Sequence, residues 1–382
     1  MISQIFAYPF RIFFLSVALL ALLVVPAWLL VLPGGVALPL AFAPLHWHQH
    51  EMLFGFLQAA IAGFLLTAVC NWTGTDRLHG VPLMALWALW LAGRVLMWGG
   101  AAAPAWLVHV VDLAFLPAVM ADAGWRIVKS RQWRQAVVMA VLGVLWLMEI
   151  GFHARPGPPF AGGALLMAMT LMLVIGGRIT PAFSGNWLRM HGGDPSRIVV
   201  IPWLERLTLG AMAATLGLYL VEAPAVLGIL TALLAAGASA ARLILWRGWL
   251  VRGEPLLWIL HLALAWIPVS LLLLAASVAG WVAPTAWLHA GGVGAMGALF
   301  LGVMSRVALG HTGRPLRLPP GMTAAFSFML AAGIVRVATA LGAMPWRIGV
   351  DLAATLWVLA YLLFLIRYAG ILSGPRADGK AG

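Results

Sequence analysis

The sequence is poor in charged residues and in cysteine. Only 9% of its 382 residues are Asp, Glu, Lys or Arg, whereas hydrophobic residues make up 63%. Soluble globular domains carry about 25% charged residues, so this balance excludes a water-soluble fold. The single cysteine, Cys70, excludes an internal disulfide and any metal or redox site built on paired cysteines. Because Cys70 lies in an apolar run, we expect it to be an inert core thiol.

Acidic residues are scarcer than basic ones, which gives the chain a net charge of +12. In a hydrophobic chain with 20 tryptophans, this excess is typical of a membrane protein. Basic residues of such proteins set the orientation, and tryptophans gather at the two membrane interfaces. We therefore expect a lipid bilayer around the protein and no nucleic-acid partner.

Long apolar runs account for most of the chain. A membrane-spanning helix needs about 20 mostly apolar residues. The runs predict an all-α polytopic membrane protein, and no connection is long enough for a soluble domain. We predict one transmembrane domain over residues 1–382, ending in a disordered cytoplasmic tail at 373–382. The twelve predicted spans are 11–31, 51–71, 81–99, 104–123, 136–153, 159–177, 203–222, 224–246, 255–278, 285–308, 322–343 and 346–372.

The basic residues favour one orientation of these spans. If both termini are cytoplasmic, 19 of the 23 Lys and Arg residues fall on the cytoplasmic side. Arg155 and Arg347 fall outside, and Arg94 and Arg336 fall within spans. This distribution follows the positive-inside rule and predicts that both termini are cytoplasmic.

Part of the sequence recurs at an offset of 239 residues. His50 and His289 begin spans 2 and 10, Thr-Gly pairs end both stretches, and VDLA occurs at 111–114 and at 350–353. The matches predict a parallel repeat of spans 2–4 and 10–12. A fainter match of RIVKSRQW with RLILWRGW suggests a copy in spans 6–8, and with it three four-helix units.

Metal-ligating side chains gather at the outer mouth of span 2. The run LHWHQHE contains three histidines and a glutamate: His46, His48, His50 and Glu51. In an extended chain all three rings point one way, whereas in a helix His46 and His50 share a face. Either geometry puts two imidazoles near a carboxylate, a set that suits copper, iron or zinc. We predict a metal site here, with His289 as a ligand from the second repeat and His109 nearby.

Charges inside the spans predict two ion pairs. Arg94 and Asp112 reach a similar depth in spans 3 and 4, and Arg336 and Asp351 do so in spans 11 and 12. The simpler interpretation is that each pair holds adjacent helices together. The functional interpretation is that the pairs flank a polar cavity or hold the propionates of a cofactor, because charges within a membrane are unfavourable unless they serve a site.

Two other histidines stand apart from the outer cluster. His261 lies within span 9 between tryptophans, where an imidazole serves either as an axial haem ligand or as a partner of a neighbouring helix. His311, in the basic sequence LGHTGRPLR, could hold a headgroup, a propionate or a quinol. The remaining histidines are interpreted as hydrogen-bonded fillers: His79, His153 and His191.

Four stretches of the sequence match the motifs of a known family: WHQHEMLFGFLQAAIAGFLLTAVCNWTG, RITPAFSGNW, PLLWILHLALAWIP and LHAGGVGAMGALFLGVMSRVALGHTGR. In these motifs, and over nearly its whole length, the chain resembles the NnrS family of bacterial membrane proteins. It implies about twelve spans in the bacterial cytoplasmic (inner) membrane, with haem, expected to be b-type, and copper as cofactors. It also implies a role in the response to nitric oxide and nitrosative stress, associated with denitrification.

The resemblance can be carried over motif by motif. The histidines and the glutamate that match the family's motifs are His48, His50, Glu51, His261, His289 and His311. Cys70 stands where many members have proline, and span 10 reads HAGGVGAMG where a threonine-containing run is commoner. Neither change touches a candidate ligand. The resemblance does not assign individual histidines to haem or to copper.

Three functions remain open at the level of sequence. The first is a haem–copper oxidoreductase acting on nitric oxide, with electrons from a quinol or a redox partner, because the chain has no CxxCH motif. The second is a non-catalytic protein that buffers or senses nitric oxide or metal. The third is a twelve-span transporter of a small solute or metal without haem. The polar residues concentrate in the outer half, which favours a cofactor site.

Overall fold

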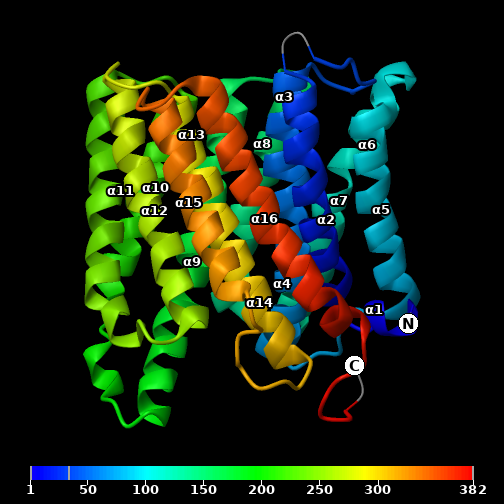
Figure 1. Ribbon diagram of the computed structural model, residues 1–382, viewed down its shortest axis with the longest axis vertical. Helices are drawn as coiled ribbons and strands as arrows, with labels where there is room; N and C mark the ends of the chain where they lie inside the picture. Colours follow the sequence, from blue (N-terminus) through cyan, green and yellow to red (C-terminus); the bar gives the residue numbers. More distant parts are fainter. Residues whose placement is uncertain (1, 33–34, 381–382) are drawn as a thin grey trace. The chain divides into compact units, whose positions relative to one another are not determined.

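The computed structural model describes residues 2–32 and 35–380 (Figure 1). The described residues form helices and no strands. Among these residues, twelve helical segments are long and apolar enough to cross a membrane, which confirms the predicted all-α polytopic fold. A helix satisfies its own backbone hydrogen bonds, so long apolar runs adopt this form in a bilayer. The last two residues of the predicted tail, 381 and 382, lie outside the described residues.

The chain divides into two compact units. Unit 1 comprises residues 1–164, 304–319 and 361–382, and unit 2 comprises residues 165–303 and 320–360. The elements before the first division are α1 (Ile2–Ile5), α2 (Pro9–Leu30), α3 (Pro44–His50), η1 (Glu51–Phe56), α4 (Leu57–Thr73), α5 (Gly80–Gly99), η2 (Gly100–Ala102), α6 (Ala105–Leu113), α7 (Phe115–Lys129), η3 (Trp133–Gln135) and α8 (Ala136–Ala154). The later elements are α9 (Pro158–Met190), η4 (Pro195–Arg197), α10 (Pro202–Leu220), α11 (Ala225–Leu245), η5 (Gly248–Val251), α12 (Pro255–Val278), α13 (Thr285–His289), η6 (Ala290–Gly297), α14 (Ala298–His311), α15 (Met322–Ala340) and α16 (Trp346–Ser373).

In unit 1, α3, η1 and α4 follow one another as a single span that runs beside α2 (Figure 1). Proline at the first helical position begins both α2 and α3, where its missing N–H would have no partner inside the helix. The span ends at Gly74, whose φ of 66° and N–H bond to the Cys70 carbonyl form a left-handed cap. These features fix the two ends of the span, and with them the positions of His50 and Glu51 along it.

The C-terminal segment of unit 1 is held by arginines. Arg11 is buried and its Nη1 donates to the carbonyls of Leu372 and Gly374. Arg376 Nη1 donates to the His311 carbonyl at 2.8 Å. The Arg376 guanidinium also bonds to Asp378 and lowers the pKa of that carboxyl to about 2. The described part of the predicted tail therefore makes specific contacts.

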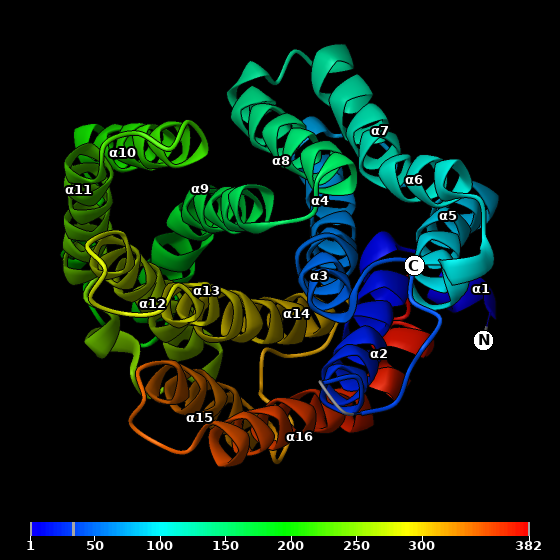
Figure 2. The ribbon, with the colours of Figure 1, turned by 90° about the horizontal axis from the view of Figure 1, so that it is seen from above.

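In unit 2, α10, α11 and α12 lie side by side (Figure 2). The helix α9 extends to Met190, past the predicted end of its span at residue 177 and through Pro181. The chain from 178 to 190 is therefore helix rather than connection. Its Leu188 packs into a buried apolar cluster with Val251 and Leu257, and this packing stabilises a helix that Pro181 would otherwise weaken.

Spans 2 and 10 share a rare local geometry. The π-helical segment η1 begins directly after His50, and the π-helical segment η6 begins directly after His289. Their first residues are separated by 239 positions, the offset of the predicted repeat. Single π-helical turns are rare and occur frequently at functional sites. The shared geometry supports the repeat of spans 2–4 and 10–12.

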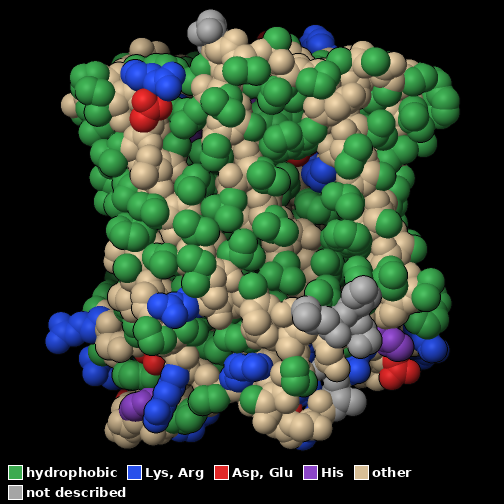
Figure 3. Space-filling model, turned by 45° about the vertical axis from the view of Figure 1, so that its right-hand side comes forward, with side chains coloured by type: hydrophobic (Ala, Val, Ile, Leu, Met, Phe, Trp, Pro, Cys, Tyr) green, Lys and Arg blue, Asp and Glu red, His purple; other side chains and the backbone are tan. Residues whose placement is uncertain are grey.

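The surface matches a bilayer environment. On the face in Figure 3, hydrophobic side chains cover the middle, and Lys and Arg side chains gather mainly near one end. Large hydrophobic residues such as Leu23, Val95 and Ile366 are more than half exposed. In water such exposure would be unfavourable, whereas in a multi-pass membrane protein these side chains contact lipid.

Candidate metal centre

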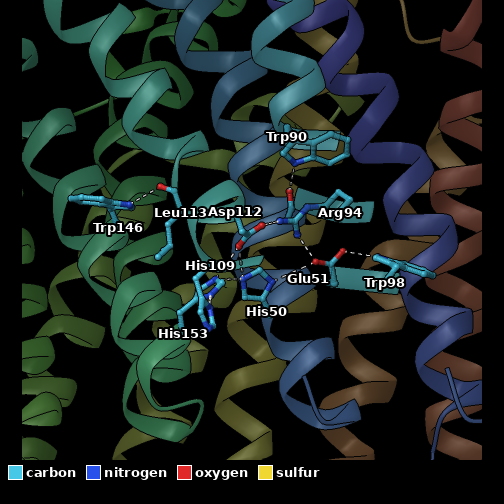
Figure 4. A network of polar contacts seen from close by, with 11 residues as sticks. His50, Glu51, Trp90, Arg94, Trp98, His109, Asp112, Leu113, Trp146 and His153 are labelled. Atoms are coloured by element: carbon cyan, nitrogen blue, oxygen red, sulfur yellow. Dashed lines mark hydrogen bonds and ion pairs between the residues drawn. The ribbon is translucent and has the colours of Figure 1, made fainter. Parts of the chain in front are cut away.

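A buried group of two histidines and two carboxylates lies in unit 1. His50 comes from α3, Asp112 from α6, and Glu149 and His153 come one turn apart from α8. Each offers one ligand atom, and these four atoms lie within 4.8 Å of one another. All four residues are at most 7% exposed. Figure 4 shows how the rings of His50 and His153 converge on Asp112.

Three of the donor atoms form a nearly equilateral triangle. His50 Nε2 lies 2.9 Å from Asp112 Oδ2 and 3.1 Å from His153 Nε2. His153 Nε2 lies 3.0 Å from Asp112 Oδ2. Two ligand atoms bound at right angles to one ion, each at about 2.1 Å, are about 3 Å apart. The triangle therefore has the spacing of ligands that share a metal ion.

The second nitrogen of each imidazole is held by a neighbour. His50 Nδ1 faces Glu51 Oε1 at 3.4 Å, and His153 Nδ1 lies 2.7 Å from His109 Nδ1. An ionised carboxylate only accepts, so Glu51 Oε1 accepts a hydrogen bond from His50 Nδ1–H, and a neutral His50 then carries its lone pair on Nε2. That lone pair faces Asp112 Oδ2, so a proton or cation must lie between the two acceptors. Metal-bound histidines are held in this way, by a bond from the nitrogen that does not ligate.

Arg94 on α5 links two carboxylates, that of Asp112 in the triangle and that of Glu51, which faces His50 Nδ1. Its Nη1 donates to Glu51 Oε1, and its Nη2 donates to Asp112 Oδ1 (Figure 4). Trp98 Nε1 donates to Glu51 Oε2 at 2.8 Å. One guanidinium thus fixes both the carboxylate in the triangle and the carboxylate that holds His50.

One glycine makes room for this guanidinium, and a second makes room for the Asp112 carboxylate. A Cβ at Gly55 would meet Arg94 Nη1, and a Cβ at Gly93 would lie 2.7 Å from Asp112 Oδ1. Gly55 lies in the π-helical turn η1, where its carbonyl accepts a hydrogen bond from Trp90 Nε1 at 3.0 Å. The turn therefore provides both the space beside Arg94 and an anchor to α5.

With its three carboxylates ionised and its histidines neutral, the centre carries excess negative charge. Glu51, Asp112 and Glu149 bring three carboxylates against the one guanidinium of Arg94. Neither oxygen of Glu149 has a hydrogen-bond partner among the described residues, although Glu149 is only 1% exposed. Buried carboxylates are strongly destabilising unless they are paired, protonated or bound to a metal. Bound protons or a bound cation must therefore offset this excess negative charge, and the four converging ligand atoms could hold such a cation.

The structure brings part of the sequence-predicted set together. Because residues 44–50 are helical, His46 and His50 share a face, and the half-buried His46 ring lies 6.2 Å from the Phe152 ring. His48 stacks on Trp28 at 4.6 Å. His289 lies in unit 2, where its Nδ1 is 2.7 Å from the Thr285 carbonyl.

Of the other predicted residues, His261, His311 and Asp351 have partners of their own. His261 Nε2 lies 2.9 Å from Ser184 Oγ, and a Cβ at Gly248 would lie 2.7 Å from the His261 ring. The His311 ring lies 5.6 Å from the Phe10 ring. A separate pair forms between Asp351 Oδ2 and Arg347 Nε at 2.8 Å, and Arg336 has no ion pair among the described residues.

Glu149 and His153 belong to this group, although the sequence does not predict either of them as a candidate ligand. The sequence interpretation of His153 is a hydrogen-bonded filler, and no role is predicted for Glu149. A signal was present, because residues four apart share one face of a helix and a carboxylate in an apolar span is rare. His153 also ends span 5 on the same side of the membrane as His50. The sequence did not show that α8 lies beside α6 at that depth.

The fold and the site together define the class of protein: a twelve-span helical membrane protein with a buried histidine–carboxylate centre. The family model described as NnrS protein matches residues 4–376, and the chain belongs to the NnrS family. No curated protein matches the chain significantly. Family membership links the chain to the nitric oxide response.

Proposed function

We propose that the protein is a membrane metalloprotein of the nitric oxide response that binds copper at His50, Asp112 and His153. The observation that carries this proposal is the triangle of two imidazole nitrogens and one carboxylate oxygen, with sides of 2.9 to 3.1 Å. Nitrogen and oxygen donors without thiolate suit copper, iron or zinc. The family resemblance favours copper among them.

The surrounding residues have distinct roles in this proposal. Glu51 and His109 orient the two rings through their Nδ1 atoms, and Arg94 fixes the carboxylates. Glu149, which has no hydrogen-bond partner among the described residues, is the candidate for a fourth ligand. When bound, copper would supply a redox-active centre within the bilayer, where nitric oxide partitions. Any turnover would need electrons from a quinol or another redox partner.

Haem binding remains a prediction from the resemblance, with His261 and His311 as candidates. The His261 ring faces Ser184 Oγ through Nε2 and has Gly248 close to it, so ligation of iron through Nε2 would require the bond to Ser184 to break. The proposed function therefore rests on the metal centre alone. We also propose that the protein lies in the bacterial cytoplasmic membrane with both termini in the cytoplasm, because of its Lys and Arg distribution.

The test is protection of cells against nitric oxide. A nitric oxide-sensitive bacterial host would express the wild type, Asp112→Asn, His153→Ala or the control His191→Ala, whose ring is exposed and stacks on Trp187. We expect growth under a nitric oxide donor to be restored by the wild type and the control only, at equal protein levels. Equal protection by all four proteins would contradict the proposal.

A further inference from the structure

A groove of 520 Å³ lies in unit 2, outside the candidate metal centre. One wall is the last part of α9 and the other is formed by residues between 195 and 200. Arg178, Asn186 and Arg189 line it among apolar side chains, and no described lining residue is acidic. Asn186 Oδ1 lies 3.5 Å from Arg189 Nη1, which keeps the amide beside the guanidinium. The groove therefore combines positively charged and apolar side chains in its lining.

Both walls of the groove are fixed by the fold itself. Asp194 accepts hydrogen bonds from the N–H and the hydroxyl of Ser196 and so caps the turn η4. Val199 N–H donates to the Leu245 carbonyl at 3.1 Å, and Ile198 packs against the buried cluster that contains Leu188. A ligand would thus bind to a groove that is already formed, without the entropic cost of ordering a loop.

The groove belongs to the membrane interface. The 33 residues of α9 span about 50 Å, and the hydrocarbon core of a bilayer is only about 30 Å thick, so one end of α9 extends past the core. Met190, Val200 and Trp203 lie beside the groove and are 74%, 46% and 59% exposed. Exposed apolar and tryptophan side chains next to arginines are typical of the headgroup region.

We propose that this groove binds the phosphate group of an anionic phospholipid headgroup. Arginine forms charge-assisted and often bidentate hydrogen bonds to phosphate, and the Asn186 amide adds a neutral donor. The apolar lining at Pro181, Ile198 and Val200 fits the first part of an acyl chain. Basic pockets beside transmembrane helices recognise anionic headgroups in the same way.

The test is lipid retention by the purified full chain, measured by native mass spectrometry during titration with phosphatidylglycerol or phosphatidylcholine. The double variant Arg178→Gln/Arg189→Gln should bind phosphatidylglycerol about thirty-fold more weakly. The matched control is Arg206→Gln, which removes a nearby basic residue that does not line the groove. It should leave binding within about twofold of the wild type.

A second variant fills the groove without changing its charge. A Cβ at Gly185 would lie 3.8 Å from the Pro195 Cβ, so the side chain of Gly185→Leu enters the space between the walls. Phosphatidylglycerol binding should fall at least tenfold, with an unchanged thermal unfolding midpoint. Wild-type binding by both groove variants would overturn the proposal. Binding of inorganic phosphate as tightly as phosphatidylglycerol would also overturn it, because the site would then belong to a soluble phosphate.

Discussion

Arg94 donates to Glu51 and Asp112 from a position that is 7% exposed, whereas Arg347 pairs with Asp351 at the surface. Removal of Arg94 would leave two buried carboxylates without their cation, which costs about 3–5 kcal/mol in comparable cases. Removal of an exposed partner costs at most about 1 kcal/mol. We therefore expect Arg94→Ala to lower the thermal unfolding midpoint far more than Arg347→Ala. Equal shifts of the two variants would show that Arg94 is not structural.

Gly93 and Gly99 give a matched pair on α5. A Cβ at Gly93 would lie 2.7 Å from Asp112 Oδ1, whereas a Cβ at Gly99 would meet nothing within 4 Å. Gly93→Ala should displace the Asp112 carboxylate and weaken copper binding by about 10- to 100-fold, the range seen when groups behind a ligand are changed. Gly99→Ala should leave the dissociation constant unchanged. Copper titration of both variants decides this, and a normal affinity for Gly93→Ala would count against Asp112 as a ligand.

Single residues also show where sequence reasoning stops. Arg94 and Asp112 could be assigned similar depths from their positions in spans 3 and 4, because the rise per residue is fixed. Glu149 and His153 could not be recognised in the same way. A ligand histidine and a filler histidine have the same appearance in a sequence, and the difference lies in which helix packs beside α8.

At the scale of elements, the π-helical turn η1 sets the direction of His50. A π-helical turn contains one residue more than the α-helix would need, and it rotates the chain before it. Deletion of Met52, a half-buried residue of η1, should restore α-helical pairing and rotate His50 and Glu51 away from Asp112. We expect the variant to remain in the membrane but to lose copper. A single-residue deletion of Gly292 in η6 is the matched control, and copper loss in that variant would instead support the predicted participation of His289.

The helix boundaries were predictable only where packing agrees with local signals. The sequence predicts that span 6 ends at residue 177, on the length of its apolar run. The helix continues to Met190 because Leu188 is buried against η5 and α12. That contact joins residues more than sixty positions apart in the sequence, so no local sequence pattern predicts it.

At the scale of the whole molecule, the twelve spans follow from the lengths of the apolar runs, because a bilayer admits few other folds. Which helices pack against one another cannot be predicted in this way. Apolar side chains fit many neighbours, so the sequence does not show that α5, α6 and α8 meet at His50.

The predicted orientation can be tested with two exposed arginines on either side of span 5. In a Cys70→Ala background, Arg131→Cys and Arg155→Cys each place one thiol in a loop. A membrane-impermeant maleimide should label position 155 in intact spheroplasts, and position 131 only after lysis. The opposite pattern would invert the topology and place the metal centre near the cytoplasm.

The central claim is that His50, Asp112 and His153 hold copper. Its most direct test is the copper-to-protein ratio of the chain purified after copper-replete expression, by elemental mass spectrometry. We expect stoichiometric copper in the wild type and in His191→Ala, and its loss in His50→Ala, Asp112→Asn and His153→Ala. A wild type without copper, or full copper in His153→Ala, would contradict the assignment of this centre.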